Sequence, residues 1–558
     1  MNSPPALSLK DIHFTYRRGT GAALDGISLE VPEGAFVGIV GANGAGKSTL
    51  CFTCNRIVPG FFRGAFNGTV KVFGADVSSS RVADLVSTVG MVFQDFEAQI
   101  FSTSVRHEVA FVMENLGLPR ERMLDEVTRW LQEMALSDLT ERDPATLSGG
   151  QKQRLALASV LAAEPPVLVL DEPTTDLDPI AARELIRCLV KIAQAGRTVV
   201  LVTHDLETLA GADTLVVMSR GTIVGSGKPE EMMMQVKALQ RHSVRPPQLA
   251  KVFAALGIAE YPATPEAAAQ RLVELGYTVE RNQPSPMSSS PSRSILVVDD
   301  LRFSYCPGDE LFQGLNLAIG EGECVALLGP NGSGKTTLLN LISGIRGVQG
   351  GSIQLGGQAL SKLSPPERAK LVGIVFQNPD HQIFQPSCLE EVAFGLHHTG
   401  VPADMIQGRA MAALEVVNLA DKSATDPFTM TKGERKKLAL ASVLACEPRL
   451  LLLDEPTTGL DAKEQDALMN LVGGLVTQGH TVVFITHSIS LAARHASRIV
   501  VMSAGRVIRD GHPLQVLHDE TTLAQAGLIA PPAVQLGKLL GTAVRTPDEL
   551  IASLTRVS

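Results

Sequence analysis

The sequence is poor in aromatic residues and in cysteine. Aromatic residues make up 4% of its 558 positions, with a single tryptophan, and its seven cysteines are odd in number and scattered. This pattern excludes a disulfide scaffold and is typical of a reducing compartment. Cys51 and Cys54 form one CxxC, but no second pair lies near it in the sequence. Their spacing on an expected helix favours packing of two small side chains over metal binding.

Long apolar runs and excess positive charge are also lacking. The start, MNSPPALSLK, has no apolar core of signal-peptide length. No apolar run reaches the roughly 18 residues that cross a bilayer. We therefore expect no intrinsic membrane span, so that any membrane role requires a partner. The net charge of −9 argues against a nucleic-acid partner.

A tandem repeat dominates what the sequence does contain. GANGAGKST begins at Gly41, and GPNGSGKTT begins at Gly329. Three further pairs of matching residues share a spacing of 283 positions: Gln94 and Gln377, Asp171 and Asp454, His204 and His487. Constant spacing over such a distance indicates a duplicated unit.

Each copy alternates short apolar runs with Gly-rich turns and helical periodicity. This pattern predicts an α/β fold, with mainly parallel sheets flanked by helices in each copy. Similar segments, PPQLAKVFAALG with TPEAAAQRL and PPAVQLGKLLG with TPDELIASL, predict a small helical C-terminal tail for each copy. The expected order is first cassette 6–235, first tail 236–282, Pro/Ser linker 283–294, second cassette 295–520 and second tail 521–558.

The strongest motif is G-x-x-x-x-G-K-[ST], which occurs once in each copy between an expected strand and an expected helix. Its glycines allow backbone N–H groups to surround a phosphate at a helix N-terminus. Lys47 and Lys335 are expected to reach the β- and γ-phosphates of ATP. The candidate nucleotide-binding residues are Gly41, Asn43, Gly44, Gly46, Lys47, Ser48 and Thr49, with Gly329, Asn331, Gly332, Gly334, Lys335, Thr336 and Thr337 in the second copy.

Acidic and histidine residues follow later strands of each copy. Asp171 and Asp454 end buried apolar runs and are candidate Mg²⁺ ligands with Ser48 and Thr336. The next residues, Glu172 and Glu455, are placed to orient and polarise an attacking water. A lone histidine after a strand is usually a packed residue. The repetition of His204 and His487 beside the other motifs favours a role at the γ-phosphate.

With these motifs, both halves resemble ATP-binding cassette ATPases, which implies two P-loop NTPase cassette domains with mainly parallel sheets flanked by helices. The resemblance implies that LSGGQ at Leu147–Gln151 is the signature and that Gln94 and Gln377 are Q-loop residues, with catalytic and metal-binding roles. It also implies that His204 and His487 are switch histidines. Leu177–Asp178 and Leu460–Asp461 match the D-loop, and Tyr16 and Tyr305 match the residue that stacks on adenine. For the tyrosines, buried strand positions are an equal alternative.

In that family the two cassettes pair head to tail, so each signature serves the other half's nucleotide. Ser148, Gly149, Gly150 and Gln151 would complete the site of Lys335. The second signature is altered to MTKGE at Met430–Glu434, and its Thr431 and Gly433 would complete the site of Lys47. Lys432 replaces a glycine that approaches the γ-phosphate, which predicts slowed hydrolysis at that site. A tolerated variant is the alternative.

The segments after the Q-loop glutamines, FQDFEAQIFSTSVRHEVAF and FQNPDHQIFQPSCLEEVAFG, resemble the ATPases of energy-coupling factor importers, as does IVPGFFRGAFNGTV at Ile57–Val70. The resemblance implies uptake of a vitamin or metal ion, with membrane-spanning scaffold and substrate-binding subunits as partners. The chain would then lie peripherally on the cytoplasmic face of the inner membrane. Glu108 and Glu391 would meet basic residues of the scaffold, or belong to a solvated helix face.

Two other functions remain as alternatives. A tandem-cassette translation factor that acts on ribosomes carries a long, highly charged linker, whereas residues 231–294 hold seven Lys/Arg and five Asp/Glu. A fused sugar-importer ATPase commonly loses more of the catalytic set in one half, whereas both halves here keep Lys, Asp, Glu and His.

Overall fold

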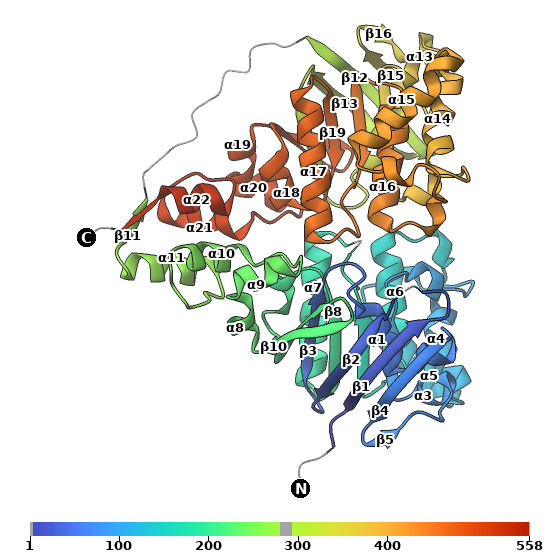
Figure 1. The fold of residues 1–558 in the computed structure, drawn as a ribbon, viewed down its shortest axis with the longest axis vertical. Helices are drawn as coiled ribbons and strands as arrows, with labels where there is room; N and C mark the ends of the chain where they lie inside the picture. Colours follow the sequence, from blue (N-terminus) through green and yellow to red (C-terminus); the bar gives the residue numbers. More distant parts are fainter. Residues whose placement is uncertain (1–3, 20, 176, 280–292, 557–558) are drawn as a thin grey trace. The chain divides into compact units, whose positions relative to one another are not determined.

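The computed structural model describes residues 4–19, 21–175, 177–279 and 293–556. The chain divides into two compact units, Met1–Ala263 and Thr264–Ser558. Each unit contains one six-stranded, mostly parallel sheet and one four-stranded antiparallel sheet (Figure 1). The Pro/Ser linker expected at 283–294 lies outside the described residues, apart from its last two positions.

In the first unit, the six-stranded sheet has the order β10-β9-β3-β8-β7-β6, and only the β9–β10 pair is antiparallel. The strands β3, β6, β7 and β8 are apolar runs buried on both faces, as expected for a sheet covered by helices on each side. The strands are β3 (Phe36–Gly41), β6 (Val89–Val92), β7 (Val167–Asp171), β8 (Thr198–Val202), β9 (Thr214–Ser219) and β10 (Thr222–Gly227).

The antiparallel sheet of the first unit has the order β2-β1-β4-β5. It consists of β1 (Leu7–Tyr16), β2 (Leu24–Val31), β4 (Gly64–Val72) and β5 (Ala75–Asp76). Three helices pack on one another as a helical lobe: α4 (Val105–Asn115), α5 (Arg120–Glu133) and α6 (Gly149–Leu161). The remaining α-helices are α1 (Lys47–Cys54), α2 (Ile57–Gly60), α3 (Val82–Leu85), α7 (Pro179–Gln194), α8 (Pro229–Met233), α9 (Val236–Arg241) and α10 (Gln248–Ala255).

The second unit repeats this topology. Its large sheet has the order β17-β18-β19-β14-β20-β21 and consists of β14 (Cys324–Leu328), β17 (Val372–Val375), β18 (Leu450–Asp454), β19 (Thr481–Ile485), β20 (Arg498–Ser503) and β21 (Arg506–Gly511). The antiparallel sheet consists of β12 (Ser294–Cys306), β13 (Asp309–Gly320), β15 (Gly350–Leu355) and β16 (Gln358–Ala359). The helices up to the tail are α12 (Lys335–Ile342), α13 (Pro365–Ala369), α14 (Cys388–His398), α15 (Ala403–Val416), α16 (Lys432–Leu444), α17 (Ala462–Thr477) and α18 (Ile489–His495).

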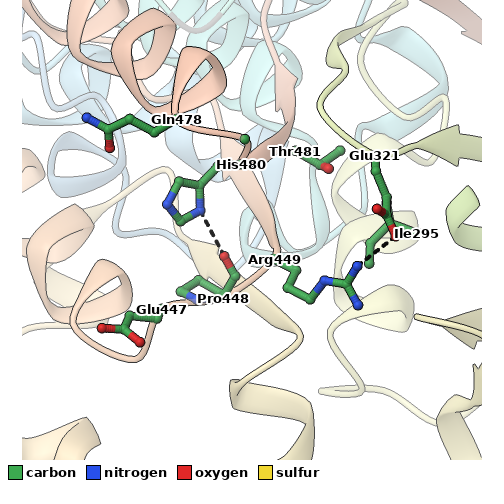
Figure 2. Close-up of a pocket in the computed structure, with 9 residues that line it drawn as sticks. Ile295, Glu321, Glu447, Pro448, Arg449, Gln478, His480 and Thr481 are labelled. Carbon is green, nitrogen blue, oxygen red and sulfur yellow. Dashed lines mark hydrogen bonds and ion pairs between the residues drawn. The ribbon is translucent and has the colours of Figure 1, made fainter. Parts of the chain in front are cut away.

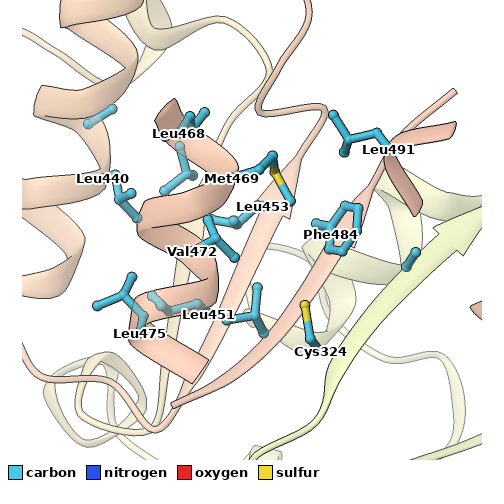
Figure 3. Packing of buried hydrophobic residues seen from close by; sticks show 14 of the residues in the cluster. Cys324, Leu440, Leu451, Leu453, Leu468, Met469, Val472, Leu475, Phe484 and Leu491 are labelled. Atoms are coloured by element: carbon cyan, nitrogen blue, oxygen red, sulfur yellow. The ribbon is translucent and has the colours of Figure 1, made fainter. Parts of the chain in front are cut away.

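The core of the second cassette lies between its large sheet and the helices that cover it. Figure 3 shows Met469 and Val472 of α17 facing Leu451 and Leu453 of β18, with Phe484 of β19 beside them. These five side chains are at most 1% exposed. Close packing of this kind fixes the position of each strand within the sheet, and therefore the position of the residues at its C-terminal end. The predicted fold class, two α/β cassette domains, is confirmed.

The helical tails bring distant segments together in the second unit. α11 (Pro265–Glu274) packs against α21 (Pro532–Leu540), and β11 (Tyr277–Val279) pairs antiparallel with β22 (Leu554–Arg556). The other tail helices are α19 (Pro513–Leu517), α20 (Glu520–Gln525) and α22 (Pro547–Ser553). The boundary between the units at Ala263–Thr264 thus lies inside the segment 236–282 that the sequence assigns to the first tail.

Among the described helices, none combines the length and hydropathy needed to cross a bilayer. Cys51 and Cys54 are buried in α1, where the Cys54 thiol donates to the Leu50 carbonyl, and burial raises the pKa of Cys54 to about 12. No cluster of three His, Cys, Asp or Glu side chains suited to a metal ion occurs in the described part of the chain.

Candidate functional site

The phosphate-binding motif forms the turn between β3 and α1, and between β14 and α12. The helices begin at Lys47 and Lys335, each preceded by a glycine with positive φ, 97° at Gly46 and 99° at Gly334. A Cβ atom on Gly46 would lie 2.5 Å from the Ala23 carbonyl oxygen. Only glycine fits this left-handed, crowded position, which brings backbone N–H groups to the start of the helix.

The motif lysines are buried and bound to the turn itself. The Lys47 ammonium group donates to the carbonyls of Gly41 and Ala42 at 3.0 Å and lies 3.8 Å from the Glu172 carboxylate. Lys335 donates to the carbonyls of Gly329 and Pro330 at 2.8 Å. Each ammonium group therefore lies inside the loop that is expected to hold the phosphates.

The candidate metal ligands lie together in both units. The Ser48 hydroxyl is hydrogen-bonded to Asp171, and the Thr336 hydroxyl is hydrogen-bonded to Asp454. Burial raises the pKa of both aspartates to about 6. The Oδ1 atoms of Asp171 and Asp454 are buried without a hydrogen-bond partner in the described structure. A hydroxyl and a buried carboxylate with an uncompensated oxygen form a donor set that suits Mg²⁺.

The three candidate catalytic side chains of each unit also meet. In the first unit, Gln94 Nε2 lies 3.1 Å from one Glu172 oxygen, and His204 Nε2 lies 2.6 Å from the other. In the second unit, Gln377 Nε2 lies 3.4 Å from Glu455 Oε2, and His487 Nε2 contacts Glu455 Oε1. In each unit these residues come from loops after three different strands, so the sheet assembles the group.

Both glutamates have a left-handed backbone, with φ of 52° at Glu172 and 44° at Glu455. This conformation costs a non-glycine residue about 1–3 kcal/mol, which its surroundings must supply. Burial alone would raise the pKa of Glu455, but hydrogen bonds from His487 and Thr458 hold that pKa below its usual value. The Glu455 carboxylate therefore stays ionised, the form that a water-orienting group requires.

The candidate adenine residues are anchored to the helix after the motif. The hydroxyls of Tyr16 and Tyr305 are hydrogen-bonded to Thr49 and Thr337 at 3.0 and 2.9 Å. Neither tyrosine is fully buried, and Tyr305 is 54% exposed. Their surroundings differ, because Phe62 lies edge-on to Tyr16, whereas the Arg346 guanidinium lies over the Tyr305 ring.

The signature segments are N-terminal caps of α6 and α16. Ser148 and Thr431 each form a capping box, with Gln151 and Glu434 as the respective partners. The Thr431 hydroxyl accepts the Glu434 N–H at 3.3 Å, and the corresponding bond in the first unit is 3.4 Å. The altered tip therefore keeps the backbone shape of LSGGQ.

The substituted glycine position shows how Lys432 is accommodated. The Lys432 side chain lies against Gly459, the residue before the D-loop of the same half. A Cβ atom on Gly459 would lie 2.8 Å from Lys432 Nζ. A Cβ atom on Gly433 would lie 2.5 Å from an oxygen of the Glu464 carboxylate. Among the residues that the structure describes, none places a polar atom within 4 Å of the Cβ positions of Gly149 and Gly150.

The interpretation of Glu108 and Glu391 as scaffold contacts or as part of a solvated face is wrong. Both are 3% exposed. Glu108 accepts the N–H groups of Phe101 and Ser102 at 3.1 and 2.8 Å, and Glu391 accepts those of Phe384 and Gln385 at 3.0 and 2.9 Å. The sequence shows a glutamate on a helix, and only the folded loop reveals that it is enclosed.

Sequence reasoning also missed the residue pair Gln153 and Lys436, which are both buried in the signature helices. Gln153 donates to the Pro173 carbonyl, and Lys436 donates to carbonyls of the segment after Glu455. A lysine where the repeat has an uncharged glutamine was a usable signal.

A separate pocket lies at the opposite edge of the second sheet. It has a volume of about 170 Å³ and is lined by Ile295, Glu321, Glu447, Pro448, Arg449, Gln478, Gly479, His480 and Thr481 (Figure 2). Two of its charged groups are paired with each other, since Arg449 binds Glu321 at 2.6 Å. The pocket lies at the N-terminal ends of β18 and β19, whereas ligands of parallel sheets bind beyond the C-terminal ends of the strands. We therefore assign the functional site to the phosphate-binding edge.

Comparison with known proteins shows the family to which this chain belongs. The family model described as "ABC transporter" matches residues 24–175 and 312–458. An ABC transporter ATP-binding protein of Caldanaerobacter subterraneus is 38% identical over 99% of this chain and 100% of its own length. A protein of the same description from Enterococcus faecalis is 33% identical over 96% of both chains.

Among solved structures, CbiO1 from Clostridium perfringens, described as part of the ABC transporter complex CbiONQ, is 32% identical. The match covers 41% of this chain and 93% of that one, with a TM-score of 0.38. Two regions that match the family model and full-length relatives confirm the resemblance read from the motifs. The chain therefore belongs to the family of ABC transporter ATP-binding proteins, with two ATP-binding cassettes in one polypeptide.

Proposed function

We propose that this chain is the ATP-hydrolysing energy-coupling subunit of an energy-coupling factor importer, which takes up a vitamin or a metal ion. It would work on the cytoplasmic face of the membrane with a membrane-spanning scaffold and a substrate-binding subunit. The observation that carries the proposal is an exposed pair of aromatic rings in each unit, next to the loop that holds the candidate catalytic glutamine.

In the first unit, Phe101 is 61% exposed and lies edge-on to Phe111, which is 42% exposed. In the second unit, Phe384 and Phe394 form the same pair, at 56% and 39% exposure. Exposed aromatic pairs at repeat-related positions support a partner surface, because apolar side chains of this size are usually covered. The buried glutamates described above fix the backbone that presents the first ring of each pair.

The first pair lines a largely apolar groove of about 220 Å³ between the helical lobe and the sheet edge. The groove also contains Gln99, five residues after Gln94. A helix of a scaffold subunit inserted here would contact the loop of the catalytic glutamine directly. Movement of that loop on ATP binding would then be passed to the scaffold.

The proposed chemistry is hydrolysis of the β–γ phosphate bond at two sites. At each site the loop N–H groups and the lysine bind the phosphates, and Glu172 or Glu455 orients the attacking water. The switch histidine and Q-loop glutamine hold that carboxylate. Mg²⁺, held by Ser48, Asp171 and Gln94 or by Thr336, Asp454 and Gln377, would neutralise phosphate charge.

The proposal includes head-to-tail pairing of the cassettes with two unequal sites. LSGGQ of the first half would complete the site of Glu455, and MTKGE of the second half would complete the site of Glu172. Lys432 replaces a glycine of the signature that would complete the latter site, and losing one phosphate donor costs about 10²–10³ in rate. We therefore expect Glu455→Gln to abolish most ATP turnover and Glu172→Gln to remove a minor part. Equal losses in steady-state ATPase assays would contradict the asymmetry.

Partner binding tests the importer function. The protein, expressed in its native host with an affinity tag, is expected to purify from detergent-solubilised membranes with a hydrophobic scaffold subunit. Phe101→Ala with Phe384→Ala should remove that subunit from the preparation. Leu124→Ala, at a residue 49% exposed on α5, is the matched control and should retain it.

Three outcomes would contradict the importer function. Co-sedimentation with ribosomes would favour the translation-factor alternative. Retention of the scaffold by the double phenylalanine variant would place the partner surface elsewhere. Stimulation by a sugar-transporting membrane subunit would favour the sugar-importer alternative.

A further inference from the structure

The signature helix of the second half is attached to the catalytic loop by a buried lysine. Lys436, 3% exposed, lies one turn into α16. Its ammonium group donates to the carbonyls of Glu455, Pro456 and Thr458 at 3.1, 3.0 and 2.8 Å. Three donors meeting three carbonyls satisfy a buried ammonium group, and such charge-assisted bonds are about twice as strong as neutral ones.

The first half has a weaker form of this attachment. Gln153 occupies the equivalent position and reaches one carbonyl, that of Pro173. Its own Oε1 is buried and lacks a hydrogen-bond partner in the described structure. The two signature helices are otherwise nearly identical after this turn, with LALASVL in both. The substitution therefore changes one specific link and leaves the packing of the helix unchanged.

The link also changes what surrounds the glutamate. In the first half, the Thr175 hydroxyl donates to the Glu172 carbonyl at 3.2 Å and is 3.5 Å from its carboxylate. In the second half, Lys436 binds the Glu455 carbonyl, and the Thr458 hydroxyl donates to the Glu455 carboxylate at 3.0 Å. With the lysine on the carbonyl, the threonine hydroxyl thus lies closer to the carboxylate than in the first half.

We propose that Lys436 is a positioning residue for ATP hydrolysis at the site of Glu455. It holds the left-handed backbone of Glu455 at its carbonyl and leaves Thr458 to fix the carboxylate. The signature helix and catalytic loop of this half then move as one piece. This inference rests on the proposed role of Glu455 as the group that orients the attacking water.

The test uses the full chain with Glu172→Gln, so that turnover reports on the site of Glu455. Lys436→Gln reproduces the first-half residue, and Lys436→Met removes all donors at similar length. Both are expected to lower kcat about tenfold or more with KM for ATP within about twofold, because a misplaced catalytic group slows chemistry without weakening binding. Lys436→Arg, which keeps several donors, should recover part of the loss.

Lys437→Gln is the matched control, since Lys437 is the next residue, partly exposed, and has no part in the site. It should leave kcat unchanged. Binding of a fluorescent ATP analogue and the thermal melting temperature show whether each variant remains folded. If both Lys436 variants lose nucleotide binding, or if kcat and KM change together, the lysine is only structural and the proposal is wrong.

Failure of the underlying function gives a different result. Glu455→Gln in the same background should abolish the remaining turnover. If it does not, the proposed role of Glu455 fails. If Glu455→Gln abolishes turnover and the Lys436 variants keep the parental kcat, only the positioning role of Lys436 fails.

Discussion

Single buried charges decide the shape of the loops around the proposed sites. Glu108 and Glu391 lie on helices, yet each accepts two backbone N–H groups of the loop that follows the Q-loop glutamine. Lys436 donates to three carbonyls of the segment that follows β18. Buried charged groups are stable in proteins only when several hydrogen bonds compensate their lost hydration.

Glu108→Ala leaves the N–H groups of Phe101 and Ser102 without their acceptor. We expect it to lower the free energy of unfolding of the first cassette by about 2 kcal/mol, the usual cost of losing hydrogen bonds to a charged group. Trp130, the single tryptophan and 2% exposed in the adjacent helix α5, reports this unfolding by fluorescence in a denaturant titration.

The matched control for this variant is Glu114→Ala. Glu114 lies exposed on the same helix α4. Its replacement should change the denaturation midpoint little, because an exposed carboxylate loses no buried partner. Equal shifts for the two variants would show that the Glu108 contacts contribute nothing to stability.

At the scale of elements, the duplicated helices α6 and α16 have the same capping geometry but different proposed roles in catalysis. Each begins with a capping box, and the two boxes have nearly the same hydrogen-bond lengths although their sequences differ. The cap residues therefore have equal structural value. Any difference between them in catalysis must arise from the site that each serves.

The variants Ser148→Ala and Thr431→Ala test whether cap residues that contribute equally to stability contribute unequally to ATP turnover. Each should destabilise its cassette by about 1 kcal/mol, the usual cost of losing a side-chain cap. ATP turnover should fall much more in Ser148→Ala, because LSGGQ is proposed to complete the more active site. Melting temperatures and steady-state ATPase rates check both parts. Similar turnover in the two variants would argue against unequal signatures.

Many helices, strands and turns were predictable because they depend on the pattern of residues within a short stretch of sequence. Apolar runs such as LVLD before Glu172 are long enough for one buried strand, and the glycines of the phosphate loop admit few conformations. Glu108 was misread because helix periodicity does not show which polar position a later loop encloses. Lys436 was missed because its carbonyl partners lie some 20 residues away in the chain.

At the scale of the whole chain, the second compact unit includes residues from the end of the first repeat. Leu272 of α11 and Leu536 of α21 are both fully buried where these helices pack. Thr278 pairs with Thr555 at the centre of the β11–β22 ladder. The sequence similarity of the two tails gave no sign of this pairing, since contacts between distant segments depend on the folded structure.

Cleavage of the Pro/Ser segment tests this arrangement. A protease site introduced within residues 283–292 should be cut without separating the fragments, because α11 and β11 remain docked on the second unit. Size-exclusion chromatography without nucleotide is expected to show one peak. Leu272→Asp should release the fragments, because it buries an unpaired charge between α11 and α21. If the fragments of the cleaved protein that keeps Leu272 separate, the packing of α11 on α21 is contradicted.

The position of the boundary at Ala263–Thr264 has a practical consequence for engineering the protein. Val279 and Arg293, the described residues on either side of the Pro/Ser segment, belong to the same compact unit, so we expect the length of this segment to set no distance between the cassettes. Extra residues or a fluorescent tag inserted there should be tolerated without altering how far apart the two halves can move. The few residues around Ala263 are where a spacer would change that reach.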